Sequence, residues 1–309
     1  WGASSLIPAL SATALAYQST TAIALFLVMW VIALLLVPLS AALGLSGVIG
    51  AALLAGMEPS LSVLGTEAVA FLTNVNLAVL PLFLLMGSFA SAADLSSDIY
   101  RLAHTLLRHL RGGLALATIG GCAGFGALTG SSLATAATIG QVALPEMRNR
   151  GYAPGLATGC VAAGGTLGQL VPPSTVIILY AILTEESIGR LFVAAVIPAL
   201  IAVALYMLTI TLYVRLAPAS APAQEQRADL HEVLNAIKRA WGVLLLFLMV
   251  IGGLYGGVFT ATEAAAFGAL GAFLFALARG KLGGGALWRV MGEVTRTTAI
   301  DRKGVVWGK

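Results

Sequence analysis

The sequence predicts an all-α polytopic membrane protein, and three observations lead to this fold class. Hydrophobic residues make up 59% of the 309 residues, charged residues make up only 10%, and the mean hydropathy is +0.96. A soluble domain carries roughly 25% charged residues, so this chain has too few charges to cover a water-facing surface. Long apolar runs also alternate with short charged segments. Because a helix needs about 20 apolar residues to cross a bilayer, lipid is the expected solvent for most of the chain.

The first part of the chain predicts three membrane spans. Residues 22–38 and 41–57 carry no charge and are separated near Pro38, so they give two short spans. Segment 58–70 contains two glutamates and a proline, and we place it at the membrane interface. The next apolar run, 71–93, is the third span.

Residues 94–111 form an amphipathic segment with apolar side chains on one helical face and basic side chains toward the other. An interfacial helix lying in the membrane plane fits this pattern. Ser97 or Asp98 is its expected start, since polar caps and acidic residues favour the first turn. The apolar face consists of Leu95, Ile99, Leu102, Leu106 and Leu110.

Residues 112–145 are uncharged and have arginines on both flanks. The positive-inside rule places both flanks in the cytoplasm. One long span would leave its ends on opposite sides, whereas two full spans with a turn need more than about 40 residues. We therefore predict a re-entrant helical hairpin, whose tip is the segment 127–133.

Residues 156–183 are apolar but interrupted, first at Gly164 and Gly165 and then at 171–174, where two prolines are consecutive. Two prolines remove two backbone donors and end a helix. At membrane depth such a break survives only where it faces protein or a polar cavity. A span at 191–214 follows.

A cytoplasmic loop at 215–239, helical from 230 to 240, precedes a span at 241–258. The chain breaks at 259–263 and returns through 264–278. Glu263 has two interpretations: a functional carboxylate within the membrane, or a first-turn acid in a helix capped by Thr262. The sequence favours the cap.

The basic residues support this topology. Fourteen Lys and Arg residues precede residue 300, and thirteen of them fall on the side assigned to the cytoplasm, with Arg190 alone outside. The N-terminus is then outside the cytoplasm. Because the charges lie in short loops between apolar runs, they indicate orientation rather than binding to nucleic acid.

The sequence offers little support for an enzyme or a metal site. Cys122 and Cys160 lie in Gly- and Ala-rich stretches without metal-ligand spacing, so we interpret them as packing residues. The three histidines match no metal motif, and there is no nucleophile elbow. We expect no catalytic residues, no metal other than Na⁺ and no cofactor.

Two interrupted segments, 125–133 and 164–174, are the candidate sites. Broken helices expose carbonyl oxygens that coordinate cations such as Na⁺, while half-helix N-termini attract anions. Helix packing is the alternative role for each single Gly, Ser or Thr. Packing alone explains the combination of a hairpin tip and a Pro-Pro break less well.

The sequence resembles the large membrane (M) subunit of tripartite ATP-independent periplasmic (TRAP) transporters from about residue 22 to 299. The resemblance rests on several runs taken together, since none is specific alone. They are PLFLLMG at 81–87, GSSLATAATIG at 130–140, PEMRNRGY at 145–152, ATG at 157–159, AGGTLGQLVPPS at 163–174, YAILTE at 180–185 and GVFTATEAAA at 257–266.

The resemblance implies an elevator-type transporter built from inverted repeats, each holding a re-entrant hairpin. It implies a Na⁺ site, formed mostly by main-chain carbonyls, at Gly126, Thr129, Gly168, Val171 and Pro173. Many relatives have Ser at positions 126 and 129. Here Gly126 offers only its backbone, while Thr129 keeps a hydroxyl. Candidate substrate or cavity residues are Gly130, Ser131, Ser132, Thr166 and Ser174.

The resemblance also implies partners. A small four-helix membrane (Q) subunit pairs with the large one, and a periplasmic substrate-binding (P) protein delivers a small organic acid, such as a C4-dicarboxylate, for Na⁺ symport. The expected location is the cell inner membrane. A standalone ion-coupled carrier of the same hairpin architecture is the alternative. A channel would need repeated filter loops, and only one hairpin tip occurs.

The resemblance divides the chain into five segments. These are scaffold-type helices with the arm helix (1–111), the transport-domain hairpin and broken helix (112–190), a membrane helix and loop (191–240), the start of a second repeat (241–299), and a tail (300–309). Relatives continue well past residue 299. We therefore expect a C-terminally truncated permease with a non-native tail, which does not transport in the form given by this sequence.

Overall fold

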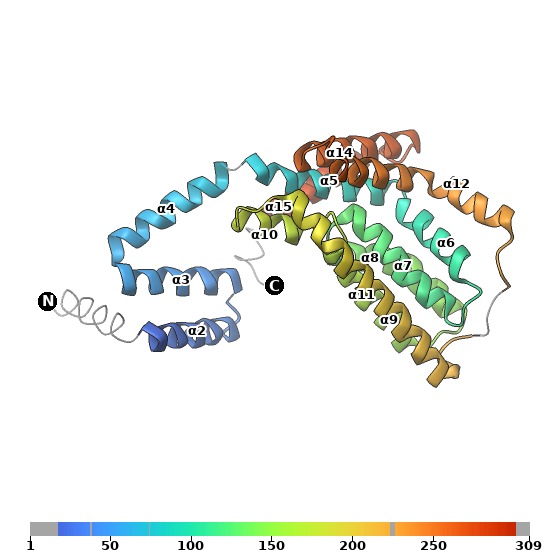
Figure 1. Cartoon of the computed structure of the whole chain (residues 1–309), viewed down its shortest axis with the longest axis horizontal. Coiled ribbons are helices and arrows are strands. Elements are labelled where there is room, and N and C mark those ends of the chain that lie inside the picture. The colour runs from blue at the N-terminus through green and yellow to red at the C-terminus, as the bar shows by residue number, and fades with distance from the viewer. Residues whose placement is uncertain (1–17, 38, 74, 223–225, 301–309) are drawn as a thin grey trace. The chain divides into compact units, whose positions relative to one another are not determined.

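The computed structural model describes residues 18–37, 39–73, 75–222 and 226–300, and helices joined by short connections make up these ranges (Figure 1). The expected tail falls almost wholly at 301–309, outside the described residues. The chain divides into two compact units, one of residues 1–77 with 296–309 and one of residues 78–295. The five-segment functional division stays a prediction.

Four helical segments among the described residues are long and apolar enough to cross a membrane, or five if one bent pair counts as a span. The bent pair, α5 (Val79–Ala92) and α6 (Leu95–Leu107), turns by 70° between its two helices. The single segments are Pro154–Leu183, Ile188–Leu216, Leu230–Tyr255 and Ala261–Ala278. The all-helical, multi-span prediction is confirmed at this level.

The first unit contains three consecutive helices of 17 residues each, α2 (Gln18–Leu34), α3 (Leu39–Ala55) and α4 (Met57–Thr73). Helix α3 contacts both α2 and α4. The two short spans predicted at 22–38 and 41–57 are therefore separate helices, each shifted by a few residues.

The predicted boundary between an interfacial segment at 58–70 and a span at 71–93 is wrong. Helix α4 runs unbroken from Met57 to Thr73, and a 3₁₀ turn, η1 (Val75–Ala78), precedes α5 (Val79–Ala92). Pro81 lies in the first turn of α5, where a missing N–H breaks no helical hydrogen bond. The proline therefore favours a helix that begins just before it.

Helix α7 (Gly113–Thr129) is the centre of the second unit, since 14 of its 17 residues are buried. It packs against α5, α8 (Ser132–Asn149), α9 (Pro154–Leu170) and α11 (Ile188–Leu216). Cys122 and Cys160 are buried free thiols. An added Cβ at Gly164 of α9 would lie 2.8 Å from the Cys122 sulfur, which supports the packing interpretation.

The remaining helices of this unit surround that centre. Helix α14 (Ala261–Ala278) lies along α5 (Figure 1), with the Phe89 and Phe273 ring centroids 5.3 Å apart. The others are α6 (Leu95–Leu107), α10 (Thr175–Leu183), η2 (Pro218–Ser220), α12 (Leu230–Phe247), the π-helical turn η3 (Leu248–Gly252) and α13 (Gly253–Tyr255). Helix α15 (Ala286–Ile300) crosses the boundary between the two units, which falls between residues 295 and 296.

Helix α6 is amphipathic as predicted, but two details differ. It begins at Leu95 after Asp94, whose backbone is left-handed, rather than at Ser97 or Asp98. The two acids form ion pairs instead, Asp94 with Lys281 and Asp98 with Arg279, each at 2.6 Å. Leu95 and Ile99 are buried in the protein core, so the first half of the apolar face packs against α7 rather than lipid. Leu106 and Leu110 remain exposed.

The break at Gly164 and Gly165 is also wrong, because α9 continues through both residues to Leu170. An added Cβ at Gly165 would lie 2.7 Å from the Cβ of Ala136 on α8. These glycines therefore permit close helix packing rather than interrupting the helix. The break at the two prolines is real, since no helix covers residues 171–174.

Helix α14 begins with a capping box in which Thr260, not Thr262, is the cap. The Thr260 hydroxyl accepts from the Glu263 N–H, and the Glu263 carboxylate accepts from the Thr260 N–H at 2.8 Å. The structure thus bears out the preferred helix-start interpretation of Glu263 and corrects its partner. The cap lies one residue before the helix, so that Glu263 occupies the third helical position.

Candidate functional site

The hairpin tip is a tight connection between α7 and α8. Gly130 has a left-handed backbone (φ 60°) and closes α7 by donating its N–H to the Gly126 carbonyl at 2.8 Å. Ser131 is extended, and its hydroxyl caps α8 by accepting from the Ala134 N–H. A glycine is suited to position 130, because a left-handed backbone is costly for other residues.

The Pro-Pro break makes a similar connection between α9 and α10. Val171 is extended, the Pro172–Pro173 peptide is cis, and Ser174 caps α10 by accepting from the Ile177 N–H. The Ser174 hydroxyl also donates to the Gln169 carbonyl. Two helices therefore end and two begin within these two connections, without any charged side chain in either.

The two connections are in direct contact. The Gly130 carbonyl accepts from the Thr175 N–H at 3.2 Å and from its hydroxyl at 2.8 Å. An added Cβ at Gly130 would lie 2.9 Å from the Pro173 carbonyl oxygen. One helical turn earlier in α7, an added Cβ at Gly126 would lie 2.7 Å from the Gly168 Cα. Small residues at these points allow the backbones to meet.

A pair of buried threonines lies next to this contact, one at the end of α7 and one in the first turn of α8. The Thr129 and Thr135 hydroxyls are 2.7 Å apart, and both side chains are almost fully buried. An added Cβ at Gly168 would lie 2.5 Å from the Thr135 hydroxyl and 2.7 Å from the Ser131 carbonyl oxygen. Thr135 therefore connects the hairpin to α9 at the level of the predicted ion-site residues.

Four of the five predicted ion-site residues present a carbonyl oxygen that accepts no hydrogen bond within the described part of the chain: Thr129, Gly168, Val171 and Pro173. Pro172 explains the unpaired carbonyl of Gly168, because the N–H of residue 172 would normally donate to the carbonyl of residue 168 and proline has no N–H. The fifth carbonyl, that of Gly126, already accepts from Gly130. Such unpaired carbonyls at helix ends suit a cation.

The predicted cavity residues do not all lie together. Gly130, Ser131 and Ser174 belong to the two connections, and Ser132 is the first residue of α8. Thr166 lies on the opposite face of α9 from Gly168, and its hydroxyl bonds to the Tyr206 hydroxyl of α11 at 3.0 Å. Thr166 is therefore separate from the hairpin tip.

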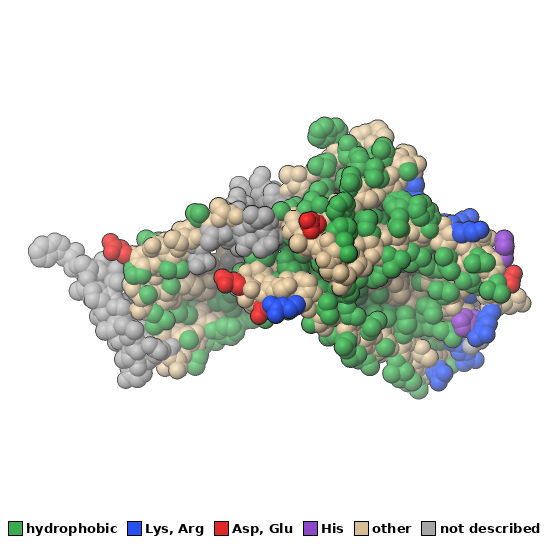
Figure 2. Space-filling view, turned by 45° about the horizontal axis from the view of Figure 1, so that its top comes forward, with side chains coloured by type: hydrophobic (Ala, Val, Ile, Leu, Met, Phe, Trp, Pro, Cys, Tyr) green, Lys and Arg blue, Asp and Glu red, His purple; other side chains and the backbone are tan. Residues whose placement is uncertain are grey.

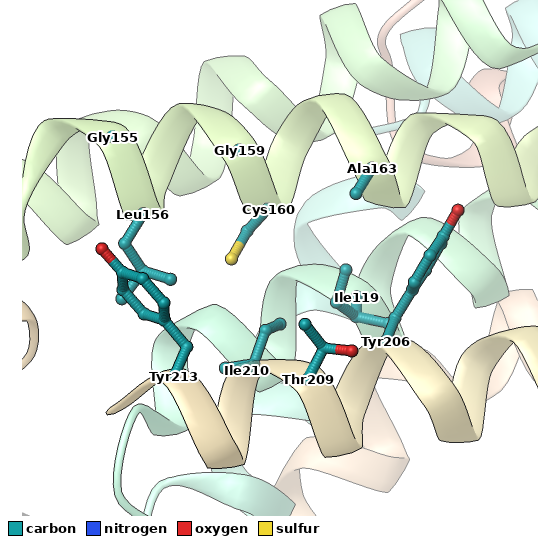
Figure 3. A pocket seen from close by; sticks show the side chains of 10 residues that line it. All are labelled: Ile119, Gly155, Leu156, Gly159, Cys160, Ala163, Tyr206, Thr209, Ile210 and Tyr213. Atoms are coloured by element: carbon teal, nitrogen blue, oxygen red, sulfur yellow. The ribbon is translucent and has the colours of Figure 1, made fainter. Parts of the chain in front are cut away.

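Tyr206 also lines an apolar groove of about 400 Å³ between α7, α9 and α11 (Figure 3). Tyr206 and Tyr213 extend from α11 toward α9, and Cys160 points into the space between the helices (Figure 3). Gly155 and Gly159 leave room on the α9 side, since an added Cβ at either meets nothing within 4 Å. No charged residue lines the groove, and the groove is separate from the hairpin contact.

The sequence interpretation missed two residues at the contact, Thr135 and Thr175. Both follow a predicted site residue closely: Thr135 is one helical turn after Ser131, and Thr175 comes directly after Ser174. That spacing is a usable signal, because residues four apart on a helix share a face. It does not reveal the partner, which for Thr175 is 45 residues away.

Residues 24–300 match the family described as Tripartite ATP-independent periplasmic transporter, DctM component. The chain belongs to this family. It is a family of transporter permeases rather than enzymes, and this DctM chain is a multi-pass membrane member of it. The predicted resemblance is thereby confirmed over most of the sequence.

Named relatives agree with this assignment. The C4-dicarboxylate TRAP transporter large permease protein DctM of Vibrio cholerae is 40% identical over 78% of this chain and 52% of its own length. Its counterpart in Pseudomonas aeruginosa is 40% identical over 64% of this chain and 45% of its own length. The isethionate TRAP transporter permease protein DctMQ of Oleidesulfovibrio alaskensis is 32% identical over 85% of this chain and 41% of its own length. The chain thus spans about half the length of these relatives.

Proposed function

We propose that this DctM chain is part of a Na⁺-coupled secondary importer of small organic acids, and that the contact between the hairpin tip and the Pro-Pro break is its ion site. The observation that carries the proposal is the set of unpaired carbonyls at Thr129, Gly168, Val171 and Pro173. Neutral oxygen ligands suit a monovalent hard cation, and neither connection contains a carboxylate.

The same arrangement supports an anionic substrate. Helices α8 and α10 both begin at this contact, capped by Ser131 and Ser174. Helix N-termini carry a partial positive charge and attract carboxylates, whereas the ends of α7 and α9 carry the opposite partial charge. A cation and an acid can therefore bind side by side at one contact, which gives a physical basis for coupling them.

The membrane arrangement is part of the proposal. The α7–α8 hairpin enters the bilayer from the cytoplasmic side and returns, and it moves with α9 and α10 as an elevator-type transport domain of the inner membrane. Visible Lys and Arg side chains of the second unit gather mostly at one end (Figure 2), which supports a single cytoplasmic side.

A small membrane (Q) subunit and a periplasmic substrate-binding (P) protein are the proposed partners. The name DctMQ of the isethionate permease supports the first. The names of the relatives include both a C4-dicarboxylate and isethionate, which supports small organic acids as the substrate class. The binding protein then selects the individual acid.

Na⁺ binding to the purified chain tests the ion site directly. The unfolding temperature in detergent is measured at rising Na⁺ with choline keeping the ionic strength constant, since a ligand that binds only the folded state stabilises it. Thr129→Val should weaken the Na⁺-dependent rise, because it removes the buried hydroxyl. Thr166→Val, on the other face of α9, is the matched control. No Na⁺-specific rise, or an equal loss in both variants, would refute the site.

Uptake into proteoliposomes tests the coupling separately. A full-length permease that contains this chain, with its small subunit and a binding protein, should import an organic acid only with an inward Na⁺ gradient. Uptake without the binding protein would instead support a standalone carrier. Uptake unaffected by Na⁺ would contradict the coupling even if Na⁺ binds.

A further inference from the structure

A second cavity, of about 550 Å³, lies between α6 and α12 and is distinct from the hairpin contact. Its lining is dominated by polar and basic side chains from these two helices. The lining residues are Arg101, His104, Thr105, Arg108, Glu232, Asn235, Ala236, Lys238 and Arg239.

The charge in this cavity is unbalanced. Four lining residues are cations and one is an acid, so 4 − 1 leaves three positive charges. The acid, Glu232, pairs with Arg108 and accepts from the Asp229 N–H, so it is already engaged. Burial lowers the pKa of His104, which keeps its imidazole neutral at neutral pH and leaves the excess at three.

Other basic residues near these helices are neutralised. Arg279 pairs with Asp98 at 2.6 Å, and Lys281 pairs with Asp94 at the same distance. By contrast, Arg101, Lys238 and Arg239 have no ion pair within the residues that the structure describes. Like charges around one cavity repel each other, and a bound anion would remove that repulsion.

The polar faces of the two helices form this cavity. The opposite side of α6 is buried through Leu95 and Ile99. On α12 the apolar stripe of Leu234, Ile237 and Trp241 lies away from the cavity residues and is exposed. Water and polar ligands can therefore reach the basic residues, while the apolar stripe of α12 suits the membrane interface.

We propose that the cavity between α6 and α12 is an anion site that binds a phosphate group, supplied either by a free phosphate or by the headgroup of an anionic phospholipid. Guanidinium groups bind phosphate oxygens through paired N–H donors, and Arg101 and Arg239 reach the cavity from opposite helices. A phosphate bound between them bridges α6, which precedes the hairpin, to α12. Occupancy would therefore stabilise the packing of these two helices.

Two binding measurements on the purified chain in detergent distinguish the sources. Equilibrium dialysis with radiolabelled inorganic phosphate, in a chloride background of constant ionic strength, tests the free anion. Native mass spectrometry with phosphatidylglycerol against zwitterionic phosphatidylethanolamine tests the headgroup. Saturable binding in either measurement is expected, and binding in neither would overturn the proposal.

Variants connect the binding to this cavity. The triple variant R101Q/K238Q/R239Q should weaken the observed binding on the order of a hundredfold, at about fivefold for each positive charge removed. The control R111Q/R148Q/R215Q removes three exposed arginines elsewhere and should retain binding. Equal loss in both variants would indicate general electrostatic attraction and refute the site.

A charge-retaining variant guards against misfolding. R101K/R239K keeps the charges and should retain most of the binding, with some loss because lysine cannot bind phosphate in a bidentate manner. All variants should show the far-UV circular dichroism of the parent. If R101K/R239K folds and loses all binding while the triple variant retains it, the proposed charge mechanism is wrong.

Discussion

Thr175 donates twice to the carbonyl oxygen of Gly130, through its backbone N–H at 3.2 Å and its hydroxyl at 2.8 Å. These two hydrogen bonds join the tip of the α7–α8 hairpin to the first residue of α10. The geometry makes the hairpin and the broken helix one structural unit. Changes at either residue should therefore affect both stability and the proposed ion site.

Thr175→Val should destabilise the chain by about 1 kcal/mol, because valine keeps the volume and removes one hydrogen bond to a half-buried carbonyl. It should also weaken the Na⁺-dependent rise in unfolding temperature. Chemical denaturation in detergent, followed by tryptophan fluorescence, measures the first effect.

Thr184→Val is the matched control for this change. The Thr184 hydroxyl donates only to the Tyr180 carbonyl within its own helical turn, and it is exposed. It should leave Na⁺ stabilisation unchanged. Equal effects of the two variants on Na⁺ stabilisation would show that the long-range bond has no special role.

Gly126→Ala should destabilise by about 1–3 kcal/mol, because the new methyl would lie 2.7 Å from the Gly168 Cα and must push α7 and α9 apart. Gly159→Ala, where an added Cβ meets nothing within 4 Å, should be neutral or stabilising, since alanine favours helix over glycine. If the close approach is real, the unfolding midpoint of Gly126→Ala lies below that of the parent, and the midpoint of Gly159→Ala lies at or above it. A neutral Gly126→Ala would contradict it.

The sequence predicted those features whose cause is local. Two consecutive prolines end a helix wherever they occur, and the break at 171–174 follows from that. Gly164 and Gly165 were misinterpreted because a glycine that allows close packing looks the same in sequence as one that breaks a helix. The partner of Thr175 is 45 residues away, and only the folded packing of the hairpin against α9 and α10 brings it close.

At the candidate site, too, some features have a local cause in the sequence and others depend on the folded packing. The unpaired Gly168 carbonyl follows from Pro172, but the interaction of Thr129 with Thr135 depends on how the hairpin turns at Gly130. The family resemblance supplied the ion-site residues as a set. Their grouping at one contact was beyond what spacing alone could establish, because α7 and α9 are joined through the intervening hairpin arm.

Arg279→Gln should destabilise by about 1 kcal/mol, because Arg279 joins the end of α14 to α6 through Asp98 at 2.6 Å and to the end of α5 through the Ala93 carbonyl at 2.8 Å. Arg190→Gln is the comparison, since the Arg190–Glu186 pair is far more exposed and its atoms are 3.5 Å apart. It should change stability little. A double-mutant cycle with Asp98→Asn isolates the pair, and a coupling energy near zero would contradict this role.

Glu263 provides the clearest separation of structure from function. Thr260→Ala should destabilise by about 1 kcal/mol through loss of the α14 cap, and Glu263→Ala should lower the unfolding temperature as well. Glu263→Gln should resemble the parent, because glutamine also completes a capping box without a charge. If Glu263→Gln keeps its stability but loses Na⁺ stabilisation or Na⁺-driven uptake, the carboxylate acts in transport and the purely structural interpretation is wrong.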